Sequence, residues 1–179
     1  MELMEIIKRR ASVRSYQDKP LPEDVVNAIL EAARYAPTAR DLQELEYRVI
    51  TNPGLIKRLS EGIAEALKKE GPPLKAPPGG FRPNFFYDAP LLVIICGPKE
   101  NRWLHADAAL AVQNIMLYAT SVNLGSCFIG MAMLLEKDPK LMQELRIGGD
   151  KAIAAAVICG YIREKPSPKE KRMKAEFFR

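Results

Sequence analysis

Apolar residues recur every three to four positions in several stretches of the chain, the spacing that places them on one face of a helix. This pattern predicts helices over 2–9, 23–36, 53–69 and 101–122. A further short helix is predicted over 139–145. Asp138 can cap its start, and proline, here Pro139, is common at the first helical position.

The other apolar stretches have the patterns of strands. Apolar and charged residues alternate over 45–49, a period of two that is typical of a strand with one wet face, near the edge of a sheet. Residues 90–97 form a continuous apolar run, which predicts a central strand buried on both faces. Further strands are predicted over 125–131 and 152–161. The chain therefore mixes helices with a sheet.

The segment 71–89 is rich in proline and glycine, a composition that suits neither a helix nor the interior of a sheet. We expect a long loop there. Phe81, Phe85, Phe86 and Tyr87 give this loop apolar material to pack. The pattern leaves open whether the loop is a surface connection pinned by aromatic residues or a lid over a ligand.

Length and composition indicate one folded domain over 1–179, with the loop at 71–89 and a basic C-terminal tail at 162–179. A length of 179 residues is usual for one domain. Hydrophobic residues make up 47% and charged residues 27%, fractions that exclude disordered, collagen-like and coiled-coil chains. There is no run of about 18 apolar residues and no signal-peptide core, so we expect a cytoplasmic protein.

Few side chains are available for metal or nucleophilic chemistry. Cys96, Cys127 and Cys159 show no CxxC spacing, and His105 is the only histidine, so we expect no metal site. Cys96 and Cys159 lie in predicted buried strands, where a thiol acts as a small hydrophobic group. No nucleophile has a partnered base, so catalysis would depend on a cofactor.

Two phosphate-binding motifs are excluded. The segment 125–130 has the outer glycines of a P-loop, but Met131 and Ala132 stand where Lys and Ser or Thr are required. There is also no GxGxxG sequence for a dinucleotide.

Basic residues are concentrated near the two ends of a chain whose formal net charge is +5. Residues 9–14 place three arginines and a serine within six positions. Guanidinium groups stay charged and contact phosphate through paired hydrogen bonds, and a hydroxyl adds a directional one. The cluster could therefore bind a phosphate, or it could only solvate the end of the preceding helix and favour its dipole.

Four segments, in order along nearly the whole chain, resemble the nitroreductase family of flavoproteins. Residues 10–14 (Arg-Ala-Ser-Val-Arg) are similar to the motif that contacts the phosphate and ribityl chain of flavin mononucleotide (FMN). Residues 36–43 are similar to the family's Ala-Pro-Ser-x-x-Asn-x-Gln loop. Residues 124–130 follow a long helix, as does the family's segment behind the flavin ring. The strand ending at Gly160 precedes a basic tail, where the family places a Lys/Arg pair on the phosphate.

The resemblance implies an α+β fold with a central mixed, mainly antiparallel sheet flanked by helices. It also implies a homodimer with two FMN sites, in which residues 10–14 of one subunit and 37–41 of the other meet one flavin. Ile129 and Gly130 would lie behind the ring near N5, where a backbone N–H could tune that atom. The candidate FMN-binding residues are Arg10, Ala11, Ser12, Arg14, Pro37, Thr38, Ala39, Asp41, Gln43, Ile129, Gly130, Lys169 and Arg172.

The activity implied is hydride transfer from NAD(P)H, through N5 of FMN, to a small acceptor such as a nitroaromatic compound or a quinone. No side chain needs to act as an acid or base, so none is named as catalytic. A flavoprotein of the same fold could instead carry out reductive dehalogenation or flavin breakdown. A nucleic-acid-binding protein could use the basic patches at 9–14 and 165–172, although no aromatic residues are interleaved with them. We expect neither nucleic acid nor a membrane as a partner.

The chain departs from the family pattern at three places. Asp41 stands where asparagine is usual, and a carboxylate can accept a hydrogen bond from the ring N3–H but cannot donate to the ring carbonyls. Gln43 is followed by Glu44 and Leu45 in place of Pro-Trp. The register of the tail is open, with Arg172 and Lys169 favoured as phosphate ligands.

Overall fold

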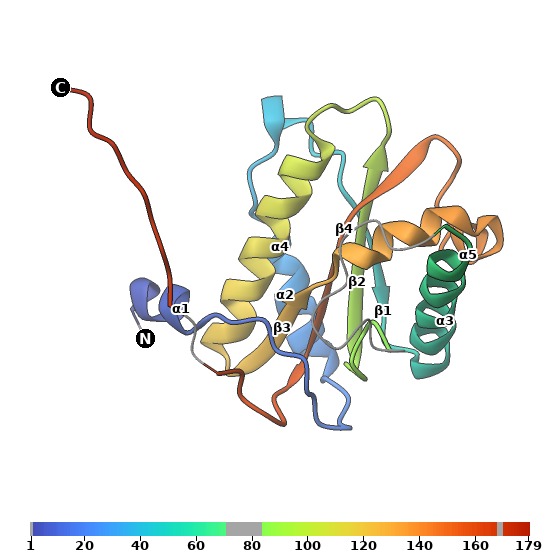
Figure 1. Ribbon diagram of the computed structural model, residues 1–179, viewed down its shortest axis with the longest axis horizontal. Coiled ribbons are helices and arrows are strands. Elements are labelled where there is room, and N and C mark those ends of the chain that lie inside the picture. The colour runs from blue at the N-terminus through green and yellow to red at the C-terminus, as the bar shows by residue number, and fades with distance from the viewer. Residues whose placement is uncertain (1, 71–83, 168–169) are drawn as a thin grey trace.

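The computed structural model describes residues 2–70, 84–167 and 170–179. Its elements form three layers, a central sheet with helices on each face (Figure 1). The strands are β1 (Glu46–Ile50), β2 (Leu91–Pro98), β3 (Leu124–Phe128) and β4 (Lys151–Tyr161), in the order β1-β2-β4-β3. Each neighbouring pair is antiparallel. A parallel contact occurs as an isolated bridge between Ser12 and Ser126. The predicted α+β fold with a mainly antiparallel sheet is confirmed.

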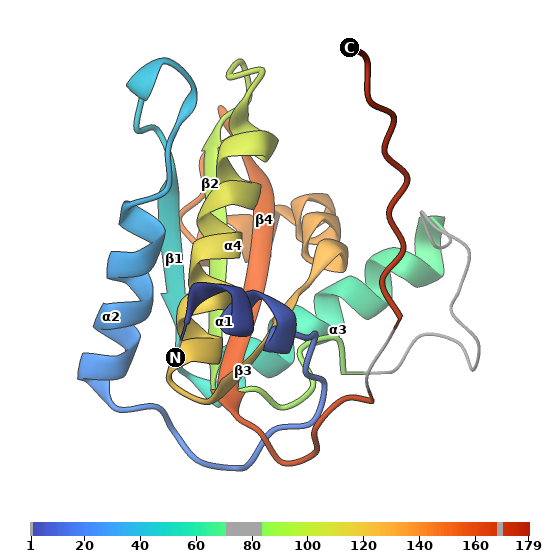
Figure 2. The same ribbon diagram turned by 90° about the vertical axis from the view of Figure 1, so that its left-hand side faces the viewer.

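Helices cover both faces of the sheet (Figures 1 and 2). On one face, α2 (Glu23–Arg34) and α4 (Leu104–Ser121) enclose a core with alternate residues of β2 and β4. On the other face, α3 (Pro53–Glu70), the 3-10 helix η2 (Gly130–Lys137) and α5 (Pro139–Glu144) enclose a second core. The helix α1 (Leu3–Arg9) buries none of its residues and lies at the C-terminal end of α4.

Most predicted elements are confirmed with small shifts at their ends. The continuous apolar run is the central strand β2, and the alternating one is the edge strand β1. Asp138 caps α5 by accepting hydrogen bonds from the N–H groups of Lys140 and Leu141. The strand predicted over 125–131 ends earlier, at Phe128, because the chain turns into η2 at Gly130.

The predicted loop at 71–89 is described only in its last part, since 71–83, with Phe81, lie outside the described residues. Phe85 and Phe86 are buried in the core beside α3. The N–H of Phe85 donates to Ser60 Oγ at 2.9 Å. Phe85 and Phe86 therefore pin the end of this segment to the core, and the choice between a surface connection and a lid stays open.

The remaining sequence expectations concern thiols and membranes. Cys96, Cys127 and Cys159 are free and buried, which confirms the prediction for Cys96 and Cys159. No helix in the described part of the chain has the length and apolar character needed to cross a bilayer. Organisation as a single domain over 1–179 stays a prediction.

Candidate functional site

The N-terminal motif is held along the free edge of β3. Ser12 forms the isolated bridge with Ser126, and the N–H of Val13 donates to the Ser126 carbonyl at 2.9 Å. Val13 is buried against Gly125, where a Cβ would come within 2.8 Å of the valine side chain. A glycine at 125 therefore lets residues 12–14 lie close to the sheet.

The inward turn of Val13 leaves its neighbours nearer the surface. Arg14 is exposed, and Arg10, Ala11 and Ser12 are half-buried. Arg9 differs from the other arginines, because its guanidinium donates to Asn123 Oδ1 at 3.0 Å. This contact joins α1 to the end of α4, which gives Arg9 a structural role in holding the two helices together.

The thiol of Cys127 reports the charges around this motif. Burial raises its pKa, while the charge of Arg14, a hydrogen bond with Ser12 and the charge of Arg10 each oppose that rise. The two guanidinium groups and the hydroxyl are therefore close to the same point of β3. Since burial dominates, Cys127 remains a neutral thiol at neutral pH.

A hollow of about 420 Å³ opens beside Arg14. The guanidinium of Arg14 lies 5.9 Å from the centre of the Tyr87 ring, and Asn84 donates to Asp88 Oδ1 at 2.7 Å. Two arginines, Arg14 and Arg163, line this hollow and favour an anionic ligand there. The lining residues are Arg14, Ser15, Tyr16, Asn84, Tyr87, Asp88 and Arg163.

Six of the seven lining residues, all except Arg14, are absent from the sequence-based candidates. The sequence around Tyr87 and Asp88 contains no turn motif, so their left-handed φ angles of 55° and 57° could not be predicted from it. Arg163 could have been found, because it is the first basic residue after the last strand.

A larger hollow of about 560 Å³ lies between α5 and the start of β4, away from these motifs. Its lysines are already engaged, because Lys99 donates to the Gly149 carbonyl at 2.7 Å and Lys151 pairs with Glu46 at 2.5 Å. It contains none of the candidate residues, so we place the candidate site beside Arg14.

The second motif, 37–43, is a compact loop that contains one 3-10 turn, Ala39–Asp41. Arg40, Asp41 and Gln43 have left-handed φ angles of 56°, 55° and 53°. The Asp41 carboxylate accepts from the Gln43 side-chain amide at 2.8 Å. Thr38 Oγ1 accepts from the N–H of Gln43 at 3.1 Å. The candidate residues of this loop therefore hold one another in place.

The two motifs lie at opposite ends of α4 (Figure 2). Ala39 bonds to Asp107 in the first turn of that helix, whereas Arg9 bonds to Asn123, just beyond its last turn. The helix has 18 residues, which corresponds to about 27 Å at a rise of 1.5 Å per residue. One chain thus does not bring the two motifs to a common ligand.

Ile129 and Gly130 differ in what they can offer a ligand. The N–H of Ile129 already donates to the Ala156 carbonyl at 2.8 Å, and its side chain is buried. The N–H of Gly130 has no acceptor among the described residues. A Cβ at Gly130 would meet only Phe128, at 3.9 Å. Gly130 therefore combines open space with an available N–H donor. Both would suit a residue that lies against one face of a flat ring.

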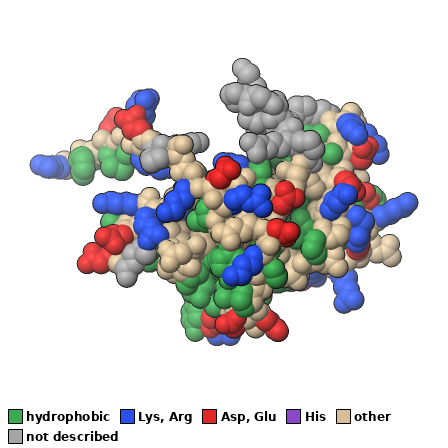
Figure 3. Space-filling model, turned by 90° about the horizontal axis from the view of Figure 1, so that it is seen from below, with side chains coloured by type: hydrophobic (Ala, Val, Ile, Leu, Met, Phe, Trp, Pro, Cys, Tyr) green, Lys and Arg blue, Asp and Glu red, His purple; other side chains and the backbone are tan. Residues whose placement is uncertain are grey.

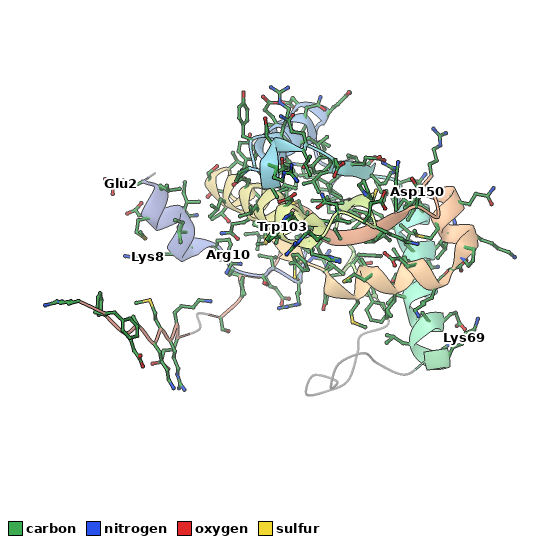
Figure 4. The ribbon with its side chains drawn as sticks, turned by 90° about the horizontal axis from the view of Figure 1, so that it is seen from above. Glu2, Lys8, Arg10, Lys69, Trp103 and Asp150 are labelled. Carbon is green, nitrogen blue, oxygen red and sulfur yellow. The ribbon has the colours of Figure 1, made fainter. Side chains whose placement is uncertain are left out.

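The C-terminal tail does not reach this site in the described residues. Lys169 lies outside them. Arg172 pairs with Glu170 at 3.4 Å, and its side chain is 88% exposed. Residues 170–179 form no helix or strand and extend away from the body (Figures 1 and 4). The second arginine beside Arg14 is instead Arg163.

Comparisons with known proteins agree with the family resemblance. A family model described as "Nitroreductase family" matches residues 7–161. A nitroreductase from Bacteroides fragilis, solved with bound FMN, is 31% identical, with a TM-score of 0.82 over 98% of this chain and 96% of that chain. An FMN-dependent nitroreductase from Clostridium difficile is 26% identical, with a TM-score of 0.71 over 93% and 91% of the two chains.

A curated relative from Methanothermobacter thermautotrophicus is provisionally named NADH dehydrogenase/NAD(P)H nitroreductase. It is 27% identical over 175 residues, which cover 95% of this chain and 82% of the relative.

Proposed function

The chain belongs to the nitroreductase family, and from this premise we propose that it is an FMN-dependent oxidoreductase. It would use NAD(P)H to reduce a small acceptor such as a nitroaromatic compound or a quinone. The observation that carries the proposal is the docking of the arginine motif on β3, where Ser12 forms a bridge with Ser126 and the N–H of Val13 donates to the Ser126 carbonyl at 2.9 Å. The same strand leads to Gly130. This arrangement offers cations and a hydroxyl for a phosphate, and open backbone for a ring.

The residues present fit FMN. Arg10, Ser12 and Arg14 would hold the phosphate and ribityl chain, with Arg163 as a further cation in the hollow beside Arg14. Gly130 would offer its N–H and its open side to the ring. When bound, FMN supplies the atom, N5, that accepts and donates hydride.

The chain's own side chains need only bind and orient. The arginines stay charged at every physiological pH, so phosphate binding does not depend on a titrating group. Asp41, which keeps one carboxylate oxygen on the Gln43 amide, would accept a hydrogen bond from the ring N3–H through the other. Lys169, outside the described residues, stays a candidate for the phosphate, and Arg172 would reach it only if residues 170–179 folded back.

A homodimer would complete the site. The motif 37–43 lies the length of α4 away from the arginines, so it would serve the flavin of the other subunit. Exposed apolar residues are available for the interface, since Leu3 and Met4 of α1 are 65% and 57% exposed and Leu110 of α4 is 45% exposed. Burying such residues against a second copy would be favourable.

Two other functions remain to be separated from this one. Reductive dehalogenation or flavin breakdown would use the same FMN site, so an activity screen has to distinguish them. Nucleic-acid binding is not favoured, because the basic side chains in Figure 3 are interspersed with acidic and uncharged ones. The expected cytoplasmic location stays a prediction.

The visible spectrum of the purified protein tests the proposal. Protein purified or reconstituted with FMN should be yellow. Anaerobic NADH or NADPH should bleach it, and a nitroaromatic compound or a quinone should restore the colour. Sedimentation should give the mass of two chains. Protein that binds no added FMN, or whose bound FMN is reduced by neither coenzyme, would contradict the proposal.

A further inference from the structure

Asp107 is a buried carboxylate that the candidate site as described above does not use. It lies in the first turn of α4 and is 4% exposed. Its Oδ1 accepts the N–H of Ala39 at 3.0 Å. A buried charge is unfavourable unless it is hydrogen-bonded, and the helix N-terminus supplies a further favourable field. The side chain is therefore paired with the loop 37–43.

That loop has a backbone that is costly for its residue types. Arg40, Asp41 and Gln43 all have left-handed φ angles, a conformation that side chains other than glycine adopt at a cost in free energy. Such residues keep this conformation only where surrounding contacts impose it. Two of the contacts, Thr38 with Gln43 and Asp41 with Gln43, lie within the loop.

The bond from Ala39 to Asp107 has a different role. Within the described residues, it is the hydrogen bond that joins the segment 37–43 to a distant element of the fold. The flanking residues Ala36 and Leu45 pack against the core that α4 shares. Between these two points, the hydrogen bond to Asp107 is the contact that fixes the loop to α4.

We propose that Asp107 is a positioning residue that fixes the loop 37–43 on the end of α4, so that Thr38 and Asp41 are presented to the flavin of the other subunit. The inference rests on the proposed function, because that flavin is the ligand the loop would meet. A carboxylate suits the task, since it is acceptor-only and the loop offers a donor. Its charge also strengthens a bond to a backbone N–H.

The test compares Asp107→Ala with Asn114→Ala. Asn114 also lies on α4 and donates to the Ala32 carbonyl at 3.1 Å, so its removal costs one similar bond without touching the loop. Asp107→Ala should raise the FMN dissociation constant roughly tenfold or more. It should also speed amide exchange of a peptide over 38–43. Asn114→Ala should change neither, and Asp107→Asn, which keeps an acceptor oxygen, should recover most of both.

Amide exchange of the FMN-free protein separates the two proposals, because it requires no cofactor. If exchange over 38–43 is unchanged in Asp107→Ala, the inference is wrong. If exchange rises but FMN binds as in the wild type, Asp107 does not position the loop for the cofactor, and the inference is also wrong. Wild-type protein that binds no FMN would overturn the proposed function and the presentation of Thr38 and Asp41 to a flavin. Faster exchange in the variant would then still support the anchoring of the loop.

A second variant covers the case in which Asp107→Ala does not fold. Ala39→Pro removes the same hydrogen bond from the loop side and leaves α4 intact. Thr38 has φ −122° and ψ 148°, which is compatible with a following proline. The same loss of FMN affinity is expected, and wild-type affinity in this variant would refute the positioning role.

Discussion

The substitution Gly125→Ala tests whether the arginine motif depends on close contact with β3. A Cβ at position 125 would lie 2.8 Å from Val13 Cβ, 2.8 Å from Cγ1 and 2.9 Å from Cγ2. Ordinary contact begins at 3.4 Å, so residues 12–14 would have to move by about 3.4 − 2.8, or 0.6 Å. Val13 is β-branched and buried, so it cannot rotate out of the way.

The displacement should reduce both stability and cofactor binding. Overpacking a core costs about 1–3 kcal/mol. Lengthening the bond between the Val13 N–H and the Ser126 carbonyl from 2.9 Å would weaken it and add up to about 1 kcal/mol. We therefore expect the free energy of unfolding to fall by about 1–4 kcal/mol. Because Ser12 and Arg14 move with Val13, FMN should also bind more weakly.

Urea unfolding of the FMN-free protein and a fluorescence titration with FMN measure the two effects. Gly149→Ala is the matched control, since a Cβ there would meet nothing within 4 Å. It should leave stability and affinity near the wild-type values. If Gly125→Ala binds FMN as tightly as the control does, the docking of residues 12–14 on β3 does not set the phosphate site.

Four further substitutions test three separate charged groups, with Arg9→Ala as the control for Arg14→Ala. Arg14→Ala should weaken FMN binding at least tenfold in a titration, whereas Arg9→Ala should leave the affinity near wild type; equal losses would contradict the division of roles. Asp41→Asn should raise the midpoint potential of bound FMN in a redox titration, because a negative charge beside the ring disfavours the electron-rich reduced state; an unchanged or lower potential would place Asp41 away from the ring. The pKa of Glu46 is lowered by hydrogen bonds from Lys151 and a neighbouring arginine, so its contribution to stability is present at neutral pH and is lost as the pH falls through its folded pKa. Urea unfolding from pH 7 down to pH 3 should show the stability difference between wild type and Glu46→Gln shrinking toward acid; a constant difference would exclude the ion pair as its source.

The hydrophobic pattern predicted well which segments form strands and which strand is central or at the edge. These features leave a pattern in the local sequence. The unbroken apolar run of β2 is typical of a strand buried on both faces, and the strand contributes to both cores. The alternation in β1 identified an edge strand for the same reason. The cap at Asp138 was also readable, since capping needs only a side chain and the next two N–H groups.

The parts of the candidate site that depend on tertiary contacts could not be read from the sequence. No glycine marks the left-handed backbone at Arg40, Asp41 and Gln43, and its outside anchor, Asp107, is more than sixty residues away in the chain. Likewise, nothing in the sequence shows that the N–H of Ile129 is used by β4, which leaves Gly130 as the available donor.

The helix α4 links the fold to the proposed assembly. Its two ends carry unlike groups, since the loop with Asp41 is anchored at its start and the arginines lie beyond its end. Two copies of the chain that pair in opposite directions along α4 would bring the loop 37–43 of each copy to Arg10 and Arg14 of the other. A two-fold axis would form both of these contacts together, because an isologous interface uses the same surface of each copy. The same 18-residue helix that fills one core would then set the distance between the two cofactor sites and the composition of each.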